Sequence, residues 1–579
     1  MGNALTSMMS ESKKIDIKNL LDKYLNNFQL EKEFRKDVFI TIIVTPKKEL
    51  ISKILTISPE TPLIFKIFPI ENTSYLKYSE DYKNIKKLYS DLKSSPNVLP
   101  IIKLEELKEA KMGVLMRQYI KYNLNDLQYH MHCVSEVEKK WVCLQLLQGL
   151  SQIHSKSKCH GDIKPNNILL SSKLSVFYSD ISVYKPAYLP IEDLQSYNTF
   201  FYSSEHDKSC YLAPERFIYS ANEIKNKKKI ELTPEMDIFS LGVVMSEIFL
   251  EKSSIFTQND MINYKSNKID LKQKLIEIKD LNIRSLLQNM IEIEPSKRAK
   301  LKDILSIFTR SLCPSPLTKL MIRLNLMIVG YEYYKNDLLI ALFYKHFQQI
   351  WKCLCINNGN LKGLKVPILK KKLNKNIILS LLNNPNDIYK IGTNFPLPFI
   401  PNKDKTLFIE SEINEDFFIE PTKYDEDNNN DCTIIIIKYL LSCLENVKYI
   451  STYFVTFEMI HYLSQILIRN DNSIIILDFI VPYYMELFKT GNSRLSIEVY
   501  NSLINLLSLI DFDKLILNQN DYNSFNDYIF KNICDFFFSC DQLEVQCAII
   551  SRLDEIIELE NNFLYSYLNT INYIINKKK

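Results

Sequence analysis

The spacing of apolar positions predicts a mixed α and β first half of the chain. From Ser135 to Ser155, apolar residues recur at three- and four-residue intervals, which predicts an amphipathic helix that starts at a capping box of Ser135 and Glu138. Pro62 to Phe68 is an apolar run with one central lysine, which predicts a strand. Two short apolar runs, 168–170 and 176–178, flank a polar turn and predict a hairpin.

The second half of the chain has the pattern of paired helices. Ile474 to Phe488 and Arg494 to Ile510 each carry an apolar face, and Gly491 to Ser493 is a polar turn between them. A helix with an early proline, here Pro482, followed by a turn and a second helix is typical of a HEAT repeat. Two further pairs are Cys432–Leu444 with Phe457–Ile468 and Tyr528–Ser539 with Val545–Leu559. Because one pair cannot bury its own face, we expect a stacked solenoid; an irregular helical domain is the alternative.

Residues 160–167 have the spacing of a protein-kinase catalytic loop, H-x-D-x-K-x-x-N. In that template the aspartate takes or orients the proton of the substrate hydroxyl, the lysine steadies the transferring phosphoryl group, and the asparagine holds a magnesium ion. We therefore predict Asp162 and Lys164 as catalytic residues and Asn167 as a metal ligand. His160 is predicted to be a structural residue of the loop.

Further kinase motifs follow in the expected order. The sequence Ser-Asp-Ile-Ser at 179–182 stands where a kinase has its metal-binding D-F-G, and Asp180 keeps the carboxylate that could hold magnesium. Glu215 ends an A-P-E motif, and Asp237 belongs to a kinase-type D-x-x-S-x-G helix start. Arg298 is the arginine that we expect to pair with Glu215.

Three substitutions within these motifs predict a domain that does not switch. Gly161 stands where the catalytic loop usually has an arginine, so a phosphate on the activation loop would lack its main partner. Ile181 and Ser182 replace the phenylalanine and glycine of D-F-G, and that glycine normally allows the segment to flip. The pattern favours a segment that is locked in one state.

Lys66 lies at the centre of the apolar run 62–68 and is predicted to contact nucleotide phosphates and a helix glutamate. Glu80 is the best candidate for that glutamate, and Glu71 is also near. The alternative is a solvated lysine on an edge strand.

The glycine-rich loop that covers the nucleotide phosphates in protein kinases is absent from the sequence. No glycine lies between Gly2 and Gly113, and residues 34–44, where that loop belongs, are bulky or charged. Such a loop needs glycines to bring backbone N–H groups close to phosphates. Nucleotide binding would then depend on Lys66, on the metal and on the hinge, where we predict Met116 and Tyr119 as contacts.

Composition limits the remaining possibilities. The chain has 579 residues, which predicts two to four domains, and a net charge of +4, which implies no nucleic-acid partner. Its 12 cysteines include no C-x-x-C pair, which suits free thiols in a reducing cytosol. The best membrane candidate, Thr433 to Leu444, is too short for a span and contains Lys438, so we expect a buried helix.

The N-terminus matches the N-myristoylation pattern M-G-x-x-x-[ST], with Gly2 as the predicted lipidation site. Together with His160–Asp162, Tyr184–Pro190 and Cys210–Phe217, this pattern resembles the vacuolar-protein-sorting regulatory subunit family of class III phosphatidylinositol 3-kinase. Members of that family are myristoylated serine/threonine-kinase-like proteins. They usually end in a WD-repeat propeller, which we do not expect in this chain.

The resemblance implies an α+β bilobal protein-kinase fold followed by an all-α HEAT-like solenoid. It implies ATP or GTP with Mg²⁺ as cofactors, and the lipid kinase catalytic subunit and a Beclin-type subunit as partners. It also implies a cytoplasmic protein attached peripherally to endosomal, Golgi, vacuolar or autophagosomal membranes, acting in protein sorting and autophagy. A myristoyl chain alone binds membranes only marginally, so a second contact is required.

The expected division is a myristoylated segment at 1–30, a kinase-like domain at 31–310, a helical connection and extended linker at 311–431, and HEAT-like repeats at 432–579. Weak or vestigial serine/threonine kinase activity fits this organisation. Three other functions remain open: a catalytically dead pseudokinase scaffold, a nucleotide-gated switch for the lipid kinase, and an independent serine/threonine kinase.

Overall fold

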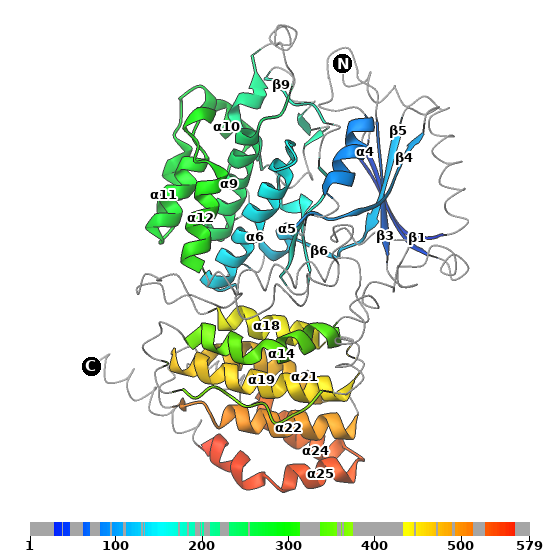
Figure 1. The fold of residues 1–579 in the computed structure, drawn as a ribbon, viewed down its shortest axis with the longest axis vertical. Coiled ribbons are helices and arrows are strands. Elements are labelled where there is room, and N and C mark those ends of the chain that lie inside the picture. Colours follow the sequence, from blue (N-terminus) through cyan, green and yellow to red (C-terminus); the bar gives the residue numbers. More distant parts are fainter. Residues whose placement is uncertain are drawn as a thin grey trace. The chain divides into compact units, whose positions relative to one another are not determined.

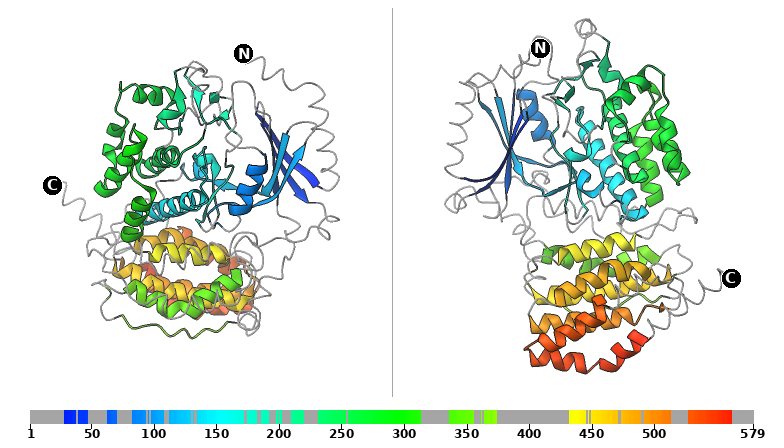
Figure 2. Two further views of the ribbon diagram at one scale, coloured as in Figure 1. Left: turned by 45° about the horizontal axis from the view of Figure 1, so that its top comes forward. Right: turned by 180° about the vertical axis from the view of Figure 1, so that it is seen from behind.

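The computed structural model contains two compact units, a first unit of described residues up to Leu312 and a helical unit of those from Asn336 on (Figures 1 and 2). Gly2, Glu71, Glu80 and Ser182, for which the sequence suggests roles, lie outside the described residues. The structure describes residues 28–36, 39–46, 62–69, 82–92, 95, 97–107, 112–128, 131, 134–171, 174–181, 185–191, 197–198, 200–201, 209–219, 231–252, 255–312, 336–355, 361, 364–373, 432–444, 447, 449–470, 473–488, 492–512 and 527–561.

The first unit begins with a five-stranded antiparallel sheet. Its strands are β1 (Phe28–Lys36), β2 (Phe39–Pro46), β3 (Leu63–Pro69), β4 (Ile101–Leu107) and β5 (Met112–Gln118), in the spatial order β1-β2-β3-β5-β4. Helix α4 (Tyr82–Asp91) lies beside the sheet (Figure 1). Alternate residues of β2, Ile40, Ile42 and Val44, are buried, as the period of two along a strand requires.

The predicted strand around Lys66 is interior, not an edge strand. Within β3, Lys66 pairs with Thr41 of β2 on one side and with Leu115 of β5 on the other. The alternative of a solvated lysine on an edge strand is therefore excluded.

Helix α6 (Glu136–His154) is the centre of the second lobe and begins at the predicted capping box. The Ser135 backbone N–H donates to the Glu138 carboxylate at 3.0 Å, and the Glu138 N–H donates to the Ser135 hydroxyl at 3.4 Å. The other helices of this lobe are α5 (Leu124–Gln128), α9 (Pro234–Leu250), α10 (Gln258–Lys265), α11 (Leu281–Met290) and α12 (Leu301–Leu312).

The prediction of an amphipathic α6 was incomplete, because neighbours cover the polar face as well. Helices α9 and α12 and strand β8 (Val176–Tyr178) pack against α6. Lys139 is consequently buried and pairs with Glu136 and Glu251 at 2.6 Å each. Lys140 pairs with Asp280 at 3.1 Å.

The predicted hairpin is present as β7 (Ile168–Leu170) and β8, joined by β6 (Tyr122–Asn123) in a three-stranded sheet. Gly149 of α6 lets this sheet approach closely, since a Cβ there would lie 2.6 Å from the ring of Tyr178. A third sheet pairs β9 (Leu189–Pro190) in parallel with β10 (Phe217–Ile218).

The helical unit consists of stacked helices. They are α14 (Asn336–Cys355), α18 (Thr433–Cys443), α19 (Ile450–Arg469), α20 (Ser473–Ile475), α21 (Val481–Phe488), α22 (Ser493–Leu507), α24 (Asn532–Ser539) and α25 (Leu543–Ile550). Contacts join α14 to α18 and α19, α19 to α22, and α22 to α25. These contacts form the expected solenoid, and the assignment of its repeats to the HEAT type stays a prediction.

Two details of the helical unit refine the sequence-based picture. The predicted helix 474–488 contains a π-helical turn, Ile476–Ile480, before Pro482, a residue that cannot donate a backbone hydrogen bond. Helix α14 lies in the span 311–431 that was expected to connect the domains, yet it packs against α18 and α19. We therefore propose that the helical unit includes α14 rather than beginning at residue 432.

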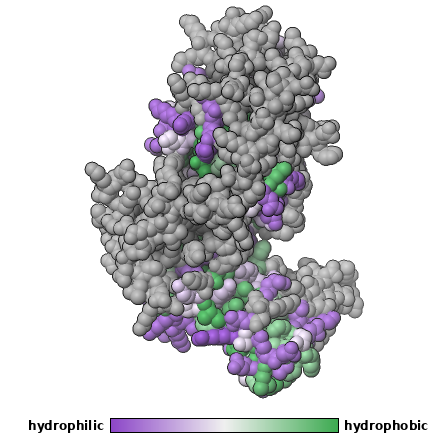
Figure 3. All heavy atoms as spheres, turned by 90° about the vertical axis from the view of Figure 1, so that its right-hand side faces the viewer, coloured by the Kyte–Doolittle hydropathy of each residue, from purple (hydrophilic) through white to green (hydrophobic). Residues whose placement is uncertain are grey.

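The last helices of the solenoid expose apolar side chains, among them Phe538, Leu543 and Ile550, and Figure 3 shows apolar surface on the helical unit. Helix α18 is buried in the solenoid, as predicted. Among the helices that the structure describes, none combines the length and the apolar character needed to cross a bilayer.

Candidate active site

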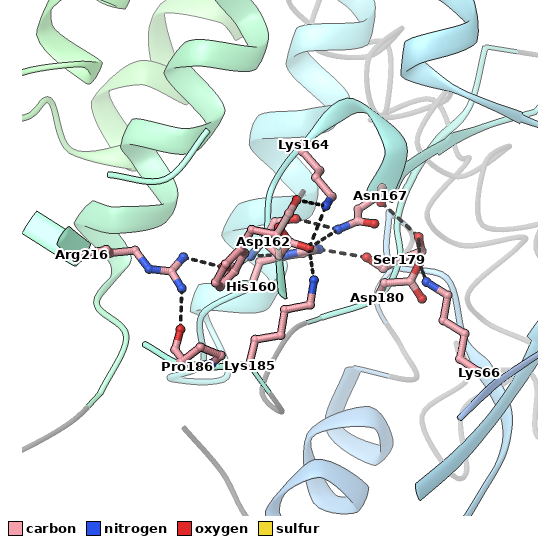
Figure 4. A network of polar contacts seen from close by, with 12 residues as sticks. Lys66, His160, Asp162, Lys164, Asn167, Ser179, Asp180, Lys185, Pro186 and Arg216 are labelled. Atoms are coloured by element: carbon pink, nitrogen blue, oxygen red, sulfur yellow. Dashed lines mark hydrogen bonds and ion pairs between the residues drawn. The ribbon is translucent and has the colours of Figure 1, made fainter. Parts of the chain in front are cut away.

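The catalytic loop, residues 160–167, runs from the end of α6 to β7. Pro165 to Asn167 forms a 3-10 turn that directs the Asn167 side chain back onto Asp162. Asn167 Nδ2 donates to the backbone carbonyl and to Oδ2 of Asp162, both at 2.8 Å. The structure therefore brings the predicted catalytic aspartate and the predicted metal ligand together (Figure 4).

Asp237, in the first turn of α9, holds the backbone of the catalytic loop. Its Oδ2 accepts the N–H of His160 at 2.7 Å, and its Oδ1 accepts the N–H of Gly161 at 2.8 Å. Gly161 has a φ of 77°, a left-handed conformation that glycine adopts at little cost. Asp237 thus fixes the backbone at the start of the catalytic loop.

The buried His160 ring links the loop to the segment that contains Asp180. Its Nε2 lies 3.1 Å from the carbonyl oxygen of Ser179, and the N–H of Asp162 donates to its Nδ1 at 3.2 Å. These two contacts place the ring proton on Nε2. Burial lowers the pKa of His160 below its ordinary 6.5, so the ring is neutral at pH 7.

Glu215 and Arg298 form the predicted ion pair. Arg298 Nη1 and Nη2 donate to Glu215 Oε1 and Oε2 at 2.6 and 2.7 Å. The Arg298 side chain is fully buried, and it also donates to the backbone carbonyls of Glu235, Glu292 and Ile293. The pair therefore fastens the residues around Glu215 to the start of α9 and to the loop after α11.

Lys66 reaches the site from β3. Its Nζ lies 2.5 Å from Asp180 Oδ2, and Arg117 Nη2 lies 3.4 Å from the same oxygen. Burial alone would raise the pKa of Asp180, but the charges of Lys66 and Arg117 hold it well below its ordinary value. Asp180 is therefore ionised at neutral pH.

Asp180 and Asn167 fit the ligand chemistry of a magnesium ion. Among the described residues, Asp180 Oδ1 is buried and has no hydrogen-bond partner. The Asn167 amide nitrogen is engaged with Asp162, which leaves the side-chain oxygen for a cation. Mg²⁺ takes oxygen ligands of these kinds, commonly one or two from the protein and others from phosphates. Asp180 also has a φ of 61°, a strained value typical of functional positions.

The hinge residues are placed differently from the other predicted contacts. Met116 lies inside β5, is only 8% exposed, and pairs with Phe65 and Lys103. The backbone N–H of Tyr119 donates to the carbonyl of Pro62 at 3.0 Å, so it is not open to a nucleotide base in this structure. Nucleotide contacts by Met116 and Tyr119 stay predictions.

Comparisons with known proteins agree with this geometry. Residues 52–307 match the family described as protein kinase domain, and residues 436–574 match the family described as PIK3R4-like, middle domain. Serine/threonine-protein kinase VPS15 of Arabidopsis thaliana is 27% identical over 78% of this chain and 31% of its own length. The chain is therefore similar to a serine/threonine-protein kinase VPS15 over most of its own length.

Two further relatives carry the same description. Serine/threonine-protein kinase VPS15 of Saccharomyces cerevisiae is 27% identical over 82% of this chain and 32% of its own length. Serine/threonine-protein kinase vps15 of Schizosaccharomyces pombe is 36% identical over 38% of this chain and 12% of its own length. The chain thus spans about a third of the length of the first two relatives, and its match to the third covers 12% of that protein. Residues 52–307 of its first unit form a protein kinase domain.

Three residues of the site were missed from the sequence. Arg117 is buried, and its Nη1 donates to the Gln118 carbonyl at 3.1 Å. Lys185 Nζ lies 2.6 Å from Asp162 Oδ2, and Arg216 donates to the carbonyl of Gly161. A signal existed for Arg117, a lone charge in an apolar strand. Lys185 and Arg216 lay in the motifs that carried the family resemblance, but their contacts are long-range.

The charged side chains of the site include more cations than carboxylates. Among the described residues, Lys66, Arg117, Lys164 and Lys185 surround the two carboxylates of Asp162 and Asp180. An excess of cations in a buried site is costly unless an anion compensates it. The arrangement therefore favours a phosphate-bearing ligand.

Proposed function

We propose that this chain is a membrane-tethered, serine/threonine kinase-like regulatory subunit of the class III phosphatidylinositol 3-kinase complex. Its first unit binds ATP or GTP with Mg²⁺, and its helical unit and N-myristoylated Gly2 connect it to partners and membranes. The partners are the lipid kinase catalytic subunit and a Beclin-type subunit. The processes are endosomal and vacuolar protein sorting and autophagy.

The observation that carries nucleotide binding is the Asp180 carboxylate: among the described residues, its buried Oδ1 has no hydrogen-bond partner, and its Oδ2 lies 2.5 Å from Lys66 Nζ. The regulatory role is supported by the order of the two matched families in one chain, a protein kinase domain followed by a PIK3R4-like middle domain.

Each side chain of the site has a defined part in this proposal. Asn167 and Asp180 would hold Mg²⁺, which neutralises phosphate charge when bound. Lys66 would move from Asp180 toward the phosphates, and Asp162 would orient an acceptor hydroxyl. Lys164 would face the transferring phosphoryl group. Because the sequence has no glycine-rich loop, Lys66 and the metal held by Asn167 and Asp180 would supply the phosphate contacts that backbone N–H groups make in such a loop.

Nucleotide binding is expected to stabilise the purified chain, and Lys66→Met or Asp180→Ala is expected to abolish that effect. Mg-ATP or Mg-GTP at 100 times its dissociation constant should add about 2.7 kcal/mol to the free energy of unfolding. The reason is that Lys66 and Asp180 supply the phosphate and metal contacts. Thermal-shift titration, repeated after addition of EDTA, measures this effect.

Lys103→Met is the matched control, because Lys103 lies in the same sheet and its side chain is 52% exposed. The unfolding temperature of Lys103→Met should rise with nucleotide as that of the wild type does. A folded wild type that shifts with neither nucleotide contradicts nucleotide binding.

Gly2→Ala is expected to move the chain partly from the membrane pellet to the soluble fraction while association with the lipid kinase persists. The reason is that the acyl chain and the partner complex supply separate membrane contacts. Tagged wild-type and variant chains, fractionated and affinity-purified from cells, measure both properties. If the wild type and Gly2→Ala are recovered equally in the membrane pellet from cells that lack the lipid kinase, the acyl anchor is contradicted.

The same affinity purification tests the alternative of an independent serine/threonine kinase. A purified chain that transfers phosphate while no lipid kinase co-purifies with it favours that alternative.

A second candidate function is a nucleotide-holding domain that transfers phosphate poorly or not at all. The observation that favours it is the contact of Lys185 with Asp162, at 2.6 Å from Oδ2. Such a domain would act on the lipid kinase as a scaffold or as a nucleotide-gated switch.

A further inference from the structure

Lys185 is bound to the predicted catalytic carboxylate. Its side chain is buried, and its Nζ donates to Asp162 Oδ2 at 2.6 Å (Figure 4). The same oxygen accepts Asn167 Nδ2 at 2.8 Å, and Lys164 Nζ lies 3.5 Å from it. A hydroxyl that approaches this oxygen would therefore compete with an ammonium group.

Lys164, the second predicted catalytic residue, is held by the same part of the chain. The activation segment comprises residues 181–215, of which 181, 185–191, 197–198, 200–201 and 209–215 are described. Lys164 Nζ donates to the backbone carbonyl of Phe201 at 2.7 Å. The Phe201 ring lies beneath Lys185, with 5.1 Å between Nζ and the ring centroid. Both catalytic side chains thus contact residues of the activation segment.

Arg216 keeps Lys185 in this position. It is 1% exposed, and it donates to the carbonyls of Ala187 and Pro186 at 2.9 Å each and to the carbonyl of Gly161 at 2.5 Å. Its guanidinium also lies 4.9 Å from the centroid of the Phe201 ring. One buried side chain therefore joins the residues directly after Lys185 to the catalytic loop.

The chain on either side of these contacts is fixed by backbone bonds. Leu189 and Pro190 of β9 pair with Phe217 and Ile218 of β10, and the N–H of Ile191 donates to Ile218 at 2.7 Å. The two motifs of the family resemblance, 184–190 and 210–217, are therefore bonded to each other. The donors of these contacts are backbone N–H groups and the Arg216 guanidinium, and the acceptors are backbone carbonyls. The contacts therefore form without a phosphate.

We infer that Lys185 is a positioning residue that occupies the acceptor side of Asp162 and suppresses phosphotransfer to a hydroxyl, while the nucleotide side of the site stays available. The inference rests on the proposed nucleotide site. On that side, Asp180 Oδ1 has no hydrogen-bond partner among the described residues, and the Lys66 side chain is 24% exposed. Phosphotransfer then requires Lys185 to leave Asp162.

The test compares the full chain with Lys185→Met, Lys185→Gln and Lys185→Arg. Each protein is assayed for the Mg-ATP thermal shift and for transfer of labelled phosphate from ATP to casein and to itself. Lys185→Met and Lys185→Gln are expected to raise kcat about tenfold or more, within the range of general-base effects, with an unchanged KM for ATP. Lys185→Arg is expected to keep the wild-type rate, because it keeps the cation. The exposed residue Lys300 provides the control variant Lys300→Met, with wild-type behaviour in both assays.

The outcomes separate this inference from the proposed function. If both neutral variants show the wild-type thermal shift with Mg-ATP but no increase in phosphate transfer, the role of Lys185 is overturned and nucleotide binding stays intact. Absence of a nucleotide shift in every folded protein contradicts the proposed function, and the inference fails with it. The gain should disappear when Asp162→Asn is added to Lys185→Met; persistence of the gain also overturns the inference. If Lys185→Met does not fold, Lys185→Gln decides, since it removes the cation and keeps a polar side chain at this position.

Discussion

Arg298→Ala is expected to lower the free energy of unfolding of the first unit by about 3–5 kcal/mol, the usual cost of removing one partner of a buried ion pair. The variant leaves the Glu215 carboxylate without its bidentate partner and removes the donor for three backbone carbonyls. It also empties the space over Phe239, whose ring centroid lies 5.0 Å from the guanidinium. Domains have total stabilities of about 5–15 kcal/mol, so the loss is a large fraction. Urea denaturation of the purified chain measures it.

The neighbouring residue Lys297 provides the control. Its Nζ lies 2.8 Å from Glu294, but the two side chains are 69% and 56% exposed. An exposed pair contributes about 0–1 kcal/mol, so Lys297→Ala should change the unfolding midpoint little. Equal, small effects of the two substitutions would show that the Glu215–Arg298 pair does not hold this part of the fold.

Asp237→Ala is expected to cost a similar amount, about 3–5 kcal/mol, and to loosen the catalytic loop. The variant removes the charged acceptor of two buried N–H groups, those of His160 and Gly161, each bond being worth about 1.5–3 kcal/mol. It also removes the partner of His154, whose Nε2 lies 3.0 Å from Asp237 Oδ2. Urea denaturation gives the energy, and hydrogen exchange at residues 160–167 reports the loop. Unchanged exchange there would contradict the role of Asp237.

The effect of Asp237→Ala should depend on pH. Burial alone would raise the pKa of Asp237. The hydrogen bond from His154, the charge of His154 and the hydrogen bond from the Gly161 N–H lower that pKa below 3.8. A carboxyl group with a lowered folded pKa contributes stability above its unfolded pKa and loses it as the pH falls through the folded pKa. The difference in the free energy of unfolding between the wild type and Asp237→Ala should therefore be complete at pH 7 and should shrink below about pH 4. Glu277→Gln, at a 66% exposed position, is the control and should change the free energy of unfolding little at pH 7.

Much of the site could be predicted because its residues lie close together in the sequence. Asp162 and Asn167 are joined by a turn of the loop itself, so their spacing alone predicts their contact. The capping box of Ser135 and Glu138 and the hairpin of β7 and β8 are equally local. The pairing of Glu215 with Arg298 was predictable only because both belong to an ordered series of motifs.

Other parts of the site could not be predicted, because they depend on which segments the fold brings together. Arg117 meets Asp180 across 63 positions of sequence, and Arg216 meets Gly161 across 55. No spacing rule covers such contacts. The helix glutamate for Lys66, proposed as Glu80 or Glu71, lies outside the described residues, and the contact that the structure does show is with Asp180.

By itself the sequence determined the two-part architecture, the order of the kinase motifs and the residues 160–167 of the catalytic loop, because periodicity and short-range spacing specify local structure. Only the tertiary structure decided the charge state and the partners of the site. It buried Asp162 and Asp180 among four cations, and it placed Lys185 and Phe201 against the two catalytic side chains. Burial and long-range contact set electrostatic energies, and both arise only when the segments pack.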